Sequence, residues 1–455
     1  MHYLVTGNRQ ALDRRYRVVG QSPVIARDLL PDQPTAAPAG LPASCRPYQR
    51  LHHFRWAIPE IHTCMAAPNG GEPCVLLARG PLAADGTPWP TLCQGWATAV
   101  PLQQIGWLVQ LARLWEPCVQ EGVASSLLAP DNIGVLGWQA CLFYLSGDPA
   151  PPPLAALGQS WQSLTPLSPP LAAIVAALCL GRIARIEELS AALENLAAAN
   201  PGRGPAGVLG ATHPGSRKAN EDCFIHDPPG TYGIVCDGMG GHEGGAVASR
   251  MALDLLDREL QQLSRQTQPL PPLQVRRGMA LALYRANQLL LETNRRQGRQ
   301  RQRQMGTTVV AYCLTGGLLH IAHVGDSRIY LIDRHHCQQL TVDDDVANQE
   351  VSLARTTSSA VLRMDGSGHL TQALGVIAME ALQPTVQTFV LPEDCLVLLC
   401  SDGLCDGALI ERCWQTVLLP MLTGDLAAGA RQLIDLALQE LGHDNITFIL
   451  LKYAA

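Results

Sequence analysis

Acidic residues recur in the second half of the chain, each beside a glycine or at the edge of a short apolar run. Five segments share this arrangement: Asn220-Glu221-Asp222, Cys236-Asp237-Gly238, Gly325-Asp326-Ser327-Arg328, Cys400-Ser401-Asp402-Gly403 and Gly442-His443-Asp444-Asn445-Ile446. Carboxylates that converge within about 5 Å repel one another strongly unless cations neutralise them. Oxygen ligands select Mg²⁺, Mn²⁺ or Ca²⁺ rather than zinc or copper. One Asp-Gly pair is a common turn, but five such segments in one half indicate a metal centre.

Short strands must position these carboxylates. Apolar or β-branched runs with turn residues between them occupy 231–236, 308–314, 318–324, 329–332, 395–400 and 446–451, and helical patterns cover 245–263 and 272–294. Many short strands without regular βα alternation predict an α+β domain with antiparallel sheets, closed as a β-sandwich flanked by helices. The ends of neighbouring antiparallel strands share one rim of such a sandwich, so residues hundreds of positions apart can converge there.

The composition predicts a globular protein of two domains. A chain of 455 residues exceeds the size at which one core stops growing, and 47% of its residues are apolar. The net charge of -6, with Lys218 and Lys452 as the only lysines, gives no reason to expect a nucleic-acid partner. Fifteen cysteines without a CxxC pair predict reduced, mostly buried thiols. Residues 1–7 lack the features of a secretory signal and no apolar run reaches about 20 residues, so we expect a cytoplasmic protein without a membrane segment.

The first half is less regular. Prolines break residues 1–45, whereas 58–62 and 75–79 predict strands and 103–119 and 171–198 predict helices. The segment Asn200-Pro201-Gly202-Arg203-Gly204-Pro205 is the strongest linker signal, because two prolines and two glycines oppose any regular element. We therefore expect an amino-terminal α/β domain over 1–199, a linker over 200–206 and a second domain over 207–455.

Within the first domain, the stretch 122–136 resembles the helix, catalytic loop and strand of a protein kinase. Pro130, Asp131 and Asn132 match the end of that loop, but Leu127 stands at the position of the catalytic aspartate. An alkyl side chain can neither accept a proton nor orient a hydroxyl, so no kinase activity is expected. The resemblance covers roughly 45–195 and predicts a degenerate, kinase-like docking or regulatory domain. The alternative is an unrelated α/β or helical domain with one Pro-Asp-Asn turn.

The second domain resembles the type 2C, metal-dependent protein serine/threonine phosphatases of bacterial type. Eight ordered motifs carry the resemblance: Arg217 with Asn220-Glu221-Asp222, Asp237-Gly238-Met239-Gly240-Gly241-His242, Met305-Gly306-Thr307-Thr308, Gly325-Asp326-Ser327-Arg328, Leu340-Thr341-Val342-Asp343, Thr371-Gln372-Ala373-Leu374-Gly375, Ser401-Asp402-Gly403-Leu404 and Asp444-Asn445-Ile446-Thr447. The resemblance implies a β-sandwich covered by helices on both faces and phosphorylated proteins as substrates.

The resemblance also implies the ligands of two Mn²⁺ or Mg²⁺ ions. Asp237 would bridge both ions, and the Gly238 carbonyl would bind one. Asp402 and Asp444 would complete one ion, whereas Glu221 and Asp222 would act around the other, partly through water. Asp326 with Asp402 matches the ligands of a third ion that many bacterial members hold.

The chemistry implied is attack on phosphorus by a metal-activated hydroxide. The planar guanidinium of Arg217 would hold two phosphate oxygens, which lysine cannot reproduce. None of the cysteines lies in a Cys-x5-Arg setting, so a thiol nucleophile is not expected. The competing hypothesis is a binding protein or scaffold in which the phosphatase fold has no significant turnover.

Departures from the family pattern concern the acid and a loop. Met239 follows Asp-Gly where some members carry a histidine, so water or another group must protonate the leaving oxygen. His242 is a second candidate acid, although a turn histidine is the simpler interpretation. The loop from Asp343 to Leu370 is expected beside the site as a flap that selects substrates. The basic run 295–303 is interpreted as a solvated helix end, with a docking patch for phosphate-rich partners as the alternative.

Overall fold

The fold was analysed in a computed structural model of the chain, which describes residues 1–31, 41–66, 73–200, 202–240, 244–266, 270–300, 303–361 and 364–455. These residues form two compact units. The first unit contains residues 1–196 and 346–369, and the second contains residues 197–345 and 370–455. The segment 346–369 therefore belongs to the first unit, although in the sequence it lies between two strands of the second unit.

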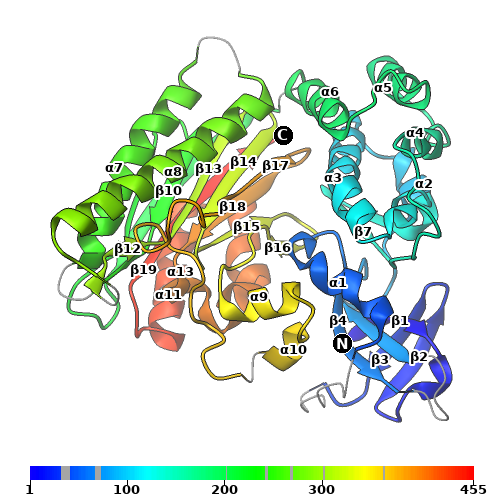
Figure 1. Ribbon diagram of the computed structural model, residues 1–455, viewed down its shortest axis with the longest axis horizontal. Helices are drawn as coiled ribbons and strands as arrows, with labels where there is room; N and C mark the ends of the chain where they lie inside the picture. Colours follow the sequence, from blue (N-terminus) through cyan, green and yellow to red (C-terminus); the bar gives the residue numbers. More distant parts are fainter. Residues whose placement is uncertain are drawn as a thin grey trace. The chain divides into compact units, whose positions relative to one another are not determined.

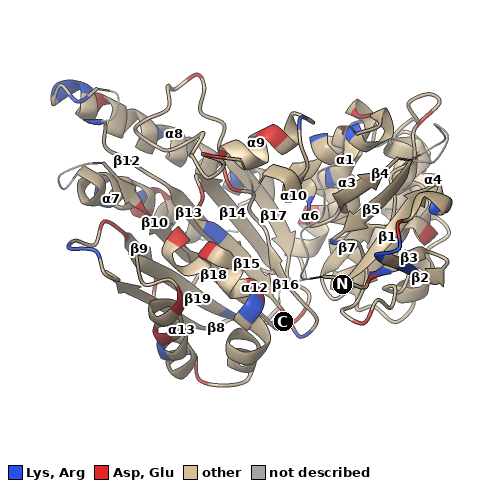
Figure 2. Cartoon of the chain, turned by 90° about the horizontal axis from the view of Figure 1, so that it is seen from below, with Lys and Arg blue, Asp and Glu red and all other residues tan. Residues whose placement is uncertain are grey.

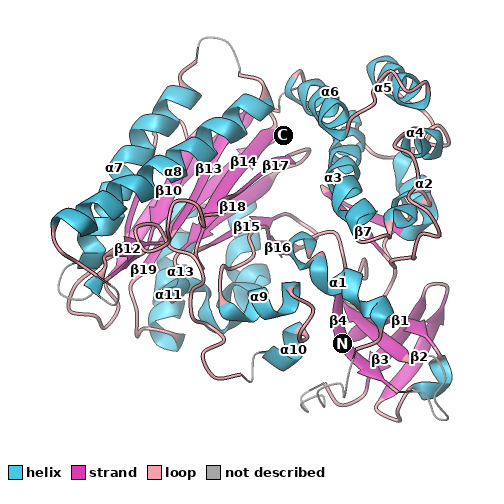
Figure 3. Ribbon diagram, viewed as in Figure 1, coloured by secondary structure: helices cyan, strands magenta, loops and turns pink. Residues whose placement is uncertain are grey.

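The second unit is built on two five-stranded antiparallel sheets (Figures 1 and 3). One sheet has the order β17-β14-β13-β10-β9 and the other β16-β15-β18-β19-β8. The strands are β8 (Gly204–His213), β9 (Cys223–His226), β10 (Tyr232–Cys236), β13 (Val309–Thr315), β14 (Leu318–Val324), β15 (Arg328–Ile332), β16 (Cys337–Gln339), β17 (Thr385–Val390), β18 (Cys395–Cys400) and β19 (Ile446–Ala454), with a short ribbon of β11 (Gly238–Met239) and β12 (Gly306–Thr307). The predicted antiparallel sandwich is confirmed, because β10 and β13 pack against β18 and β19.

Helices cover the outer faces of both sheets. Two long helices, α7 (Gly244–Ser264) and α8 (Pro272–Arg296), lie side by side on the sheet of β10, β13 and β14 (Figure 3). The other sheet is covered by α11 (Asp402–Cys405), α12 (Leu409–Cys413) and α13 (Leu426–Glu440). Each sheet and its helices share an apolar core of buried Leu, Val, Ile and Ala side chains, which fixes the strand ends where the acidic residues lie.

The first unit begins with a five-stranded antiparallel sheet of order β2-β3-β1-β5-β4. Its strands are β1 (His2–Gly7), β2 (Tyr16–Gln21), β3 (Val24–Asp28), β4 (Glu60–Met65) and β5 (Cys74–Ala78). A helical part follows, with the hairpin β6 (Ile133–Leu136) and β7 (Gln139–Leu142). The helices are α1 (Arg46–Arg50), α2 (Leu92–Trp96), α3 (Pro101–Gln120), α4 (Ala155–Trp161), α5 (Pro169–Cys179) and α6 (Ile186–Ala198), and α9 (Val346–Ser352) and α10 (Ser358–Val361) come from the returning segment.

Three sequence predictions differ from the structure. Residues 1–45 hold three strands, which the sequence did not reveal because polar residues interrupt their apolar pattern. The single helix predicted over 171–198 is two helices, since Gly181 adopts a φ of 67° between them. Strand β8 begins at Gly204, inside the predicted linker, because pairing with β19 compensates the poor local strand propensity.

The cysteines and helices bear on two further predictions. All fifteen cysteines are free thiols, and most are buried, as predicted. Among the described residues, we find no helix with the length and apolar character needed to cross a membrane. Basic residues gather at the carboxyl end of α8, where the helix ends in Arg295 and Arg296, in agreement with a solvated helix end (Figure 2).

Candidate metal and phosphate site

The predicted acidic residues lie at the ends of strands of both sheets. Asp237 follows β10, Asp326 follows β14, and Asp402 is the first residue of α11 after β18. Asp444 precedes β19, and Asp222 precedes β9. The electrostatic interactions described next show that these side chains converge, as the sandwich topology predicts.

Asp237 is the centre of the cluster. Burial raises the pKa of the Asp237 carboxyl well above its ordinary value, and the charges of Asp222, Asp402 and Asp326 raise it further. Its backbone carbonyl accepts hydrogen bonds from the Thr308 amide at 2.8 Å and from the Thr307 hydroxyl at 2.8 Å, which fix the turn after β10. A carboxyl held among three others by a rigid backbone requires a compensating positive charge if all four are to ionise.

Buried hydroxyl groups donate hydrogen bonds to the Asp222 carboxylate. The Ser401 hydroxyl donates to Asp222 Oδ2 at 2.8 Å and accepts from the Thr447 amide at 3.0 Å. Burial raises the pKa of Asp222 to about 6, although hydrogen bonds from Ser401 and Thr447 oppose the shift and the charge of Asp402 adds to it. Ser401 is fully buried, so its hydroxyl orients the Asp222 carboxylate from the protein interior.

Arg217 and Asp444 form a direct ion pair. Arg217 Nη2 lies 2.6 Å from Asp444 Oδ2, and Arg217 Nε donates to the His443 carbonyl at 3.1 Å. The Arg217 side chain is 56% exposed to solvent, so its guanidinium is accessible to a ligand. The residue predicted to bind phosphate therefore lies beside a predicted metal ligand.

Asn445 ties the loop of Arg217 to the start of β19. Its amide nitrogen donates to the carbonyls of Pro214 and Ala219, each at 3.0 Å, and its Oδ1 accepts from the Glu221 amide at 2.8 Å. The side chain is nearly fully buried, at 5% exposure. Three hydrogen bonds from one rigid side chain thus hold both ends of the segment that carries Arg217 and Glu221.

Glu221 and the Gly238 carbonyl meet at Gly245, the second residue of α7. A methyl group added to Gly245 would lie 2.7 Å from the Glu221 carboxyl carbon and 2.7 Å from the Gly238 oxygen. Only glycine therefore allows α7 to approach these two groups. The structure brings together the side chain and the carbonyl that the sequence assigned to the metal pair.

Asp326 follows Gly325 at the end of β14. Burial raises the pKa of Asp326 to about 8, with contributions from the charges of Asp402 and Asp343, whereas Arg328 lowers it. Arg328 binds both oxygens of Asp343 from its Nε and donates to Oδ2 from Nη2 at 2.7 Å. Arg328 is thus engaged by Asp343, and Asp326 is left among carboxylates.

Burial also raises the pKa of Asp402, with further contributions from Asp406 and Asp444. Among the described residues, no three Asp, Glu, His or Cys side chains are already placed as a metal-binding group. Two of the carboxylates have protein partners, because Asp222 accepts from Ser401 and Asp444 accepts from Arg217. The donor set nevertheless fits hard divalent cations, because it consists of buried carboxylates that raise one another's pKa and a carbonyl.

Three residues of this site were not predicted from the sequence. Ser401, Asn445 and Gly245 contribute no charge, so only the convergence of the strands reveals their roles. Their one sequence signal is their position beside Asp402, Asp444 and the Asp-Gly turn. The alternative acid His242 lies outside the described residues, and His443 is exposed.

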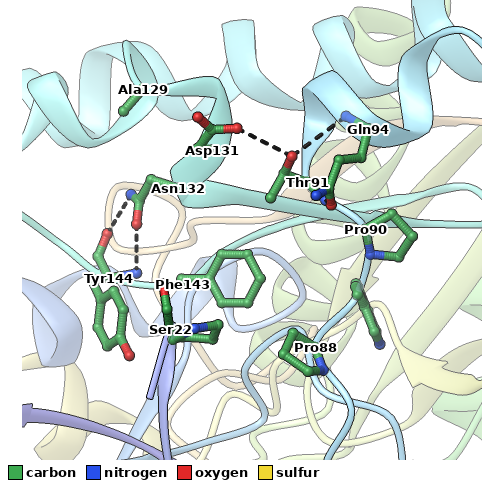
Figure 4. Close-up of a pocket in the computed structure, with 12 residues that line it drawn as sticks. Ser22, Pro88, Pro90, Thr91, Gln94, Ala129, Asp131, Asn132, Phe143 and Tyr144 are labelled. Carbon is green, nitrogen blue, oxygen red and sulfur yellow. Dashed lines mark hydrogen bonds between the residues drawn. The ribbon is translucent and has the colours of Figure 1, made fainter. Parts of the chain in front are cut away.

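A separate cavity lies within the first unit. It has a volume of about 1140 Å³, and Figure 4 shows its lining. The Thr91 hydroxyl donates to Asp131 at 3.2 Å on one wall, while Asn132 donates to the Tyr144 carbonyl at 2.8 Å (Figure 4). The lining residues are Ser22, Pro23, Pro88, Trp89, Pro90, Thr91, Gln94, Ala129, Asp131, Asn132, Phe143 and Tyr144. Asp131 is the one charged residue among the described residues of this lining.

Comparison with known proteins identifies the second unit. The family model described as protein phosphatase 2C matches residues 209–427. The chain is 32% identical over 222 residues to the serine/threonine phosphatase stp of Listeria monocytogenes, covering 48% of this chain and 83% of that protein. It is 29% identical over 252 residues to the protein phosphatase PhpP of Streptococcus pneumoniae, covering 53% and 95%.

One solved structure is also similar to this chain. The catalytic domain of the serine/threonine protein phosphatase PstP, solved in complex with two manganese ions, is 27% identical, with a TM-score of 0.45, and the match covers 55% of this chain and 98% of that one. The match covers 83% of the Listeria phosphatase, which confirms the resemblance based on the eight motifs. The chain therefore belongs to the protein phosphatase 2C family of metal-dependent protein serine/threonine phosphatases.

Proposed function

We propose that this protein hydrolyses phosphoserine and phosphothreonine monoesters of proteins at a centre of two Mn²⁺ or Mg²⁺ ions. The observation that carries the proposal is the cluster of Asp237 with Asp222, Asp402 and Asp326, whose charges raise the pKa of Asp237. Divalent cations are the natural partners of such a cluster, because they neutralise several carboxylates at once.

The proposed ligands are those that the family resemblance implies. Asp237 and the Gly238 carbonyl would hold the ions centrally, with Asp402 and Asp444 on one side and Glu221 and Asp222 on the other, in part through water. Asp326 and Asp402 would hold a third ion, which suits Asp326 because its pKa is raised by burial and by neighbouring carboxylates.

When bound, the ions would lower the pKa of a water molecule and stabilise the charge on the phosphoryl group. Arg217 binds and orients the phosphate, since its exposed guanidinium is already positioned against Asp444. Ser401 orients Asp222, and Asn445 positions the Arg217 loop. The Met239 side chain has no ionisable proton to donate, so protonation of the leaving oxygen falls to water.

We further propose that the first unit is a kinase-like docking domain without transferase activity. Leu127 is fully buried in the core and offers no group that could serve as a base. The described residues that line the cavity beside Asp131 include no Lys or Arg side chain to bind the phosphates of a nucleotide (Figure 4). An assay of protein phosphorylation from ATP should give no signal with the full chain; a signal lost in a Asp131→Asn variant would contradict this proposal.

The phosphatase proposal is tested with the full chain on a chromogenic aryl phosphate and on a phosphothreonine peptide, with Mn²⁺ and with chelator. We expect turnover only with the metal, and Asp237→Asn should abolish it. Asp435→Asn, on the exposed face of α13, is the matched control and should keep normal turnover. Calorimetric titration with Mn²⁺ supplies a readout independent of activity. Equal, negligible turnover with metal and chelator would instead support the scaffold hypothesis.

A further inference from the structure

The segment 346–369 links the two units in an unusual way. It belongs to the first unit by its packing, although both of its ends continue into the second unit. Its helices α9 and α10 lie against α1, β4 and the turn His52–Phe54 of the first unit. The loop expected from the sequence as a flap of the phosphatase is therefore folded onto the amino-terminal unit.

Specific hydrogen bonds hold the segment in this position. Gln49 Nε2 donates to the Thr356 carbonyl at 2.6 Å, and the Ser359 hydroxyl donates to the His62 carbonyl at 2.9 Å. His52 Nε2 lies 2.8 Å from Asn348 Oδ1. These three contacts reach both α9 and α10, so they fix the segment at more than one point.

The contacts are partly buried, and two of the residues that the first unit contributes to them are buried. Gln49 is 2% exposed and His52 is 3% exposed. Glu60 extends the network, because its carboxylate lies 3.9 Å from His52 Nδ1 and is hydrogen-bonded to Ser358. Arg79 Nε lies 3.6 Å from the other oxygen of Glu60. Buried polar groups are costly unless paired, so removal of a partner should release the segment.

The ends of the segment are fixed beside the candidate site in the second unit. Asp344 Oδ2 accepts from the Gly325 amide at 2.9 Å, one residue before Asp326. The Asp344 carbonyl accepts from the Thr371 amide at 2.7 Å, and Asp345 pairs with Leu370. The residues that enter and leave the segment are thus joined to the strand end that carries Asp326.

We propose that the first unit positions the 346–369 segment and thereby determines which phosphoproteins the phosphatase accepts. This proposal rests on the proposed function of the second unit. A segment held on Gln49, His52 and Glu60 presents one fixed surface to a protein substrate, whereas a small aryl phosphate needs only the metal centre and Arg217. The first unit is therefore a specificity-determining element of the phosphatase reaction.

The test uses the full chain with two variants from opposite sides of the contact. Gln49→Ala alters the first unit, and the double variant Asn348→Ala, Ser359→Ala alters the segment. Gln349→Ala, the exposed neighbour of Asn348 on α9, is the matched control. Hydrogen–deuterium exchange over 346–361 should rise at least tenfold in both test variants and stay unchanged in the control.

Kinetics complete the test. Both test variants should raise KM for a phosphothreonine protein at least fivefold while kcat/KM for the aryl phosphate stays within twofold of wild type. Faster exchange without a change in KM for the phosphoprotein, or exchange that stays slow, would overturn the proposal. Absence of aryl phosphate turnover in the wild-type chain would overturn the proposed function and this role together, and the exchange data would still report the packing itself.

Discussion

Arg217 Nη2 lies 2.6 Å from Asp444 Oδ2, so the proposed phosphate ligand and a proposed metal ligand hold each other in place. This pairing orients the guanidinium fork before substrate arrives, and Asp444 Oδ1 accepts from the Asn445 amide at 2.8 Å. A preoriented cation lowers the entropy lost when a phosphate binds. The relationship also predicts that Arg217 and Asp444 act as a unit in mutational tests.

Arg217→Ala should lower kcat/KM for an aryl phosphate about 10- to 100-fold, because a charge-assisted hydrogen bond contributes about 1.5–3 kcal/mol. Arg217→Lys should recover only part of this loss, since an ammonium cannot bind two oxygens in a plane. The control is Arg431→Ala, on an exposed position of α13. Full activity of Arg217→Ala in steady-state kinetics would show that the phosphate binds elsewhere.

Gly245→Ala should weaken Mn²⁺ binding. The added methyl group would lie 2.7 Å from the Glu221 carboxyl carbon and the Gly238 oxygen and would push them apart. Overpacking costs about 1–3 kcal/mol, which corresponds to a rise of about 5- to 150-fold in the Mn²⁺ concentration for half-maximal activity. Gly147→Ala, where an added Cβ meets nothing within 4 Å, is the control. An unchanged Mn²⁺ requirement would remove Glu221 and Gly238 from the proposed ligand set.

Ser401→Ala should destabilise the second unit, because it removes the buried partner of both Asp222 Oδ2 and the Thr447 amide. Leaving buried polar groups unpaired costs about 1–3 kcal/mol in the free energy of unfolding. Urea denaturation followed by tryptophan fluorescence measures the change, with Ser264→Ala near the end of α7 as the control. Equal midpoints for the two variants would mean that water replaces the Ser401 hydroxyl at no cost.

Ionisation of Glu393 should lower the free energy of unfolding as pH rises. Burial raises the pKa of Glu393 to about 7, and the charge of Asp333 adds to the shift, while Arg334 at 3.4 Å opposes it. The folded state therefore holds a proton that the unfolded state releases, so the stabilisation is complete below the ordinary glutamate pKa and is lost as pH rises to about 7.

Glu393→Gln removes this titration and should raise Tm relative to wild type at pH 8 but not at pH 4.5. The expected difference in the free energy of unfolding is up to about 3 kcal/mol, because the pKa of Glu393 rises from 4.5 to about 7 on folding. Thermal unfolding at the two pH values measures it, with Glu380→Gln, an exposed glutamate, as the control. A Glu393→Gln effect that is the same at both pH values would contradict a titrating carboxyl.

The sequence by itself predicted the chemistry proposed for the second unit. Asp237, Asp402 and Asp444 stood out because carboxylates beside a glycine or an apolar run at strand ends are chemically distinctive, and the strands were found because their apolar runs are long and buried on both faces. Residues such as Ser401 and Asn445 carry no such signal, because their importance lies in the partners that folding brings to them.

Only the tertiary structure shows how the strands of the first unit pair and that the segment 346–369 packs on this unit. Strands β1 to β3 escaped prediction because their polar residues hide the pattern and pairing stabilises them. The segment 346–369 looked like a loop of the phosphatase, since its ends lie between β16 and β17. Its assignment to the first unit depends on contacts with Gln49, His52 and His62, about 300 residues away, and no local pattern encodes contacts at that separation.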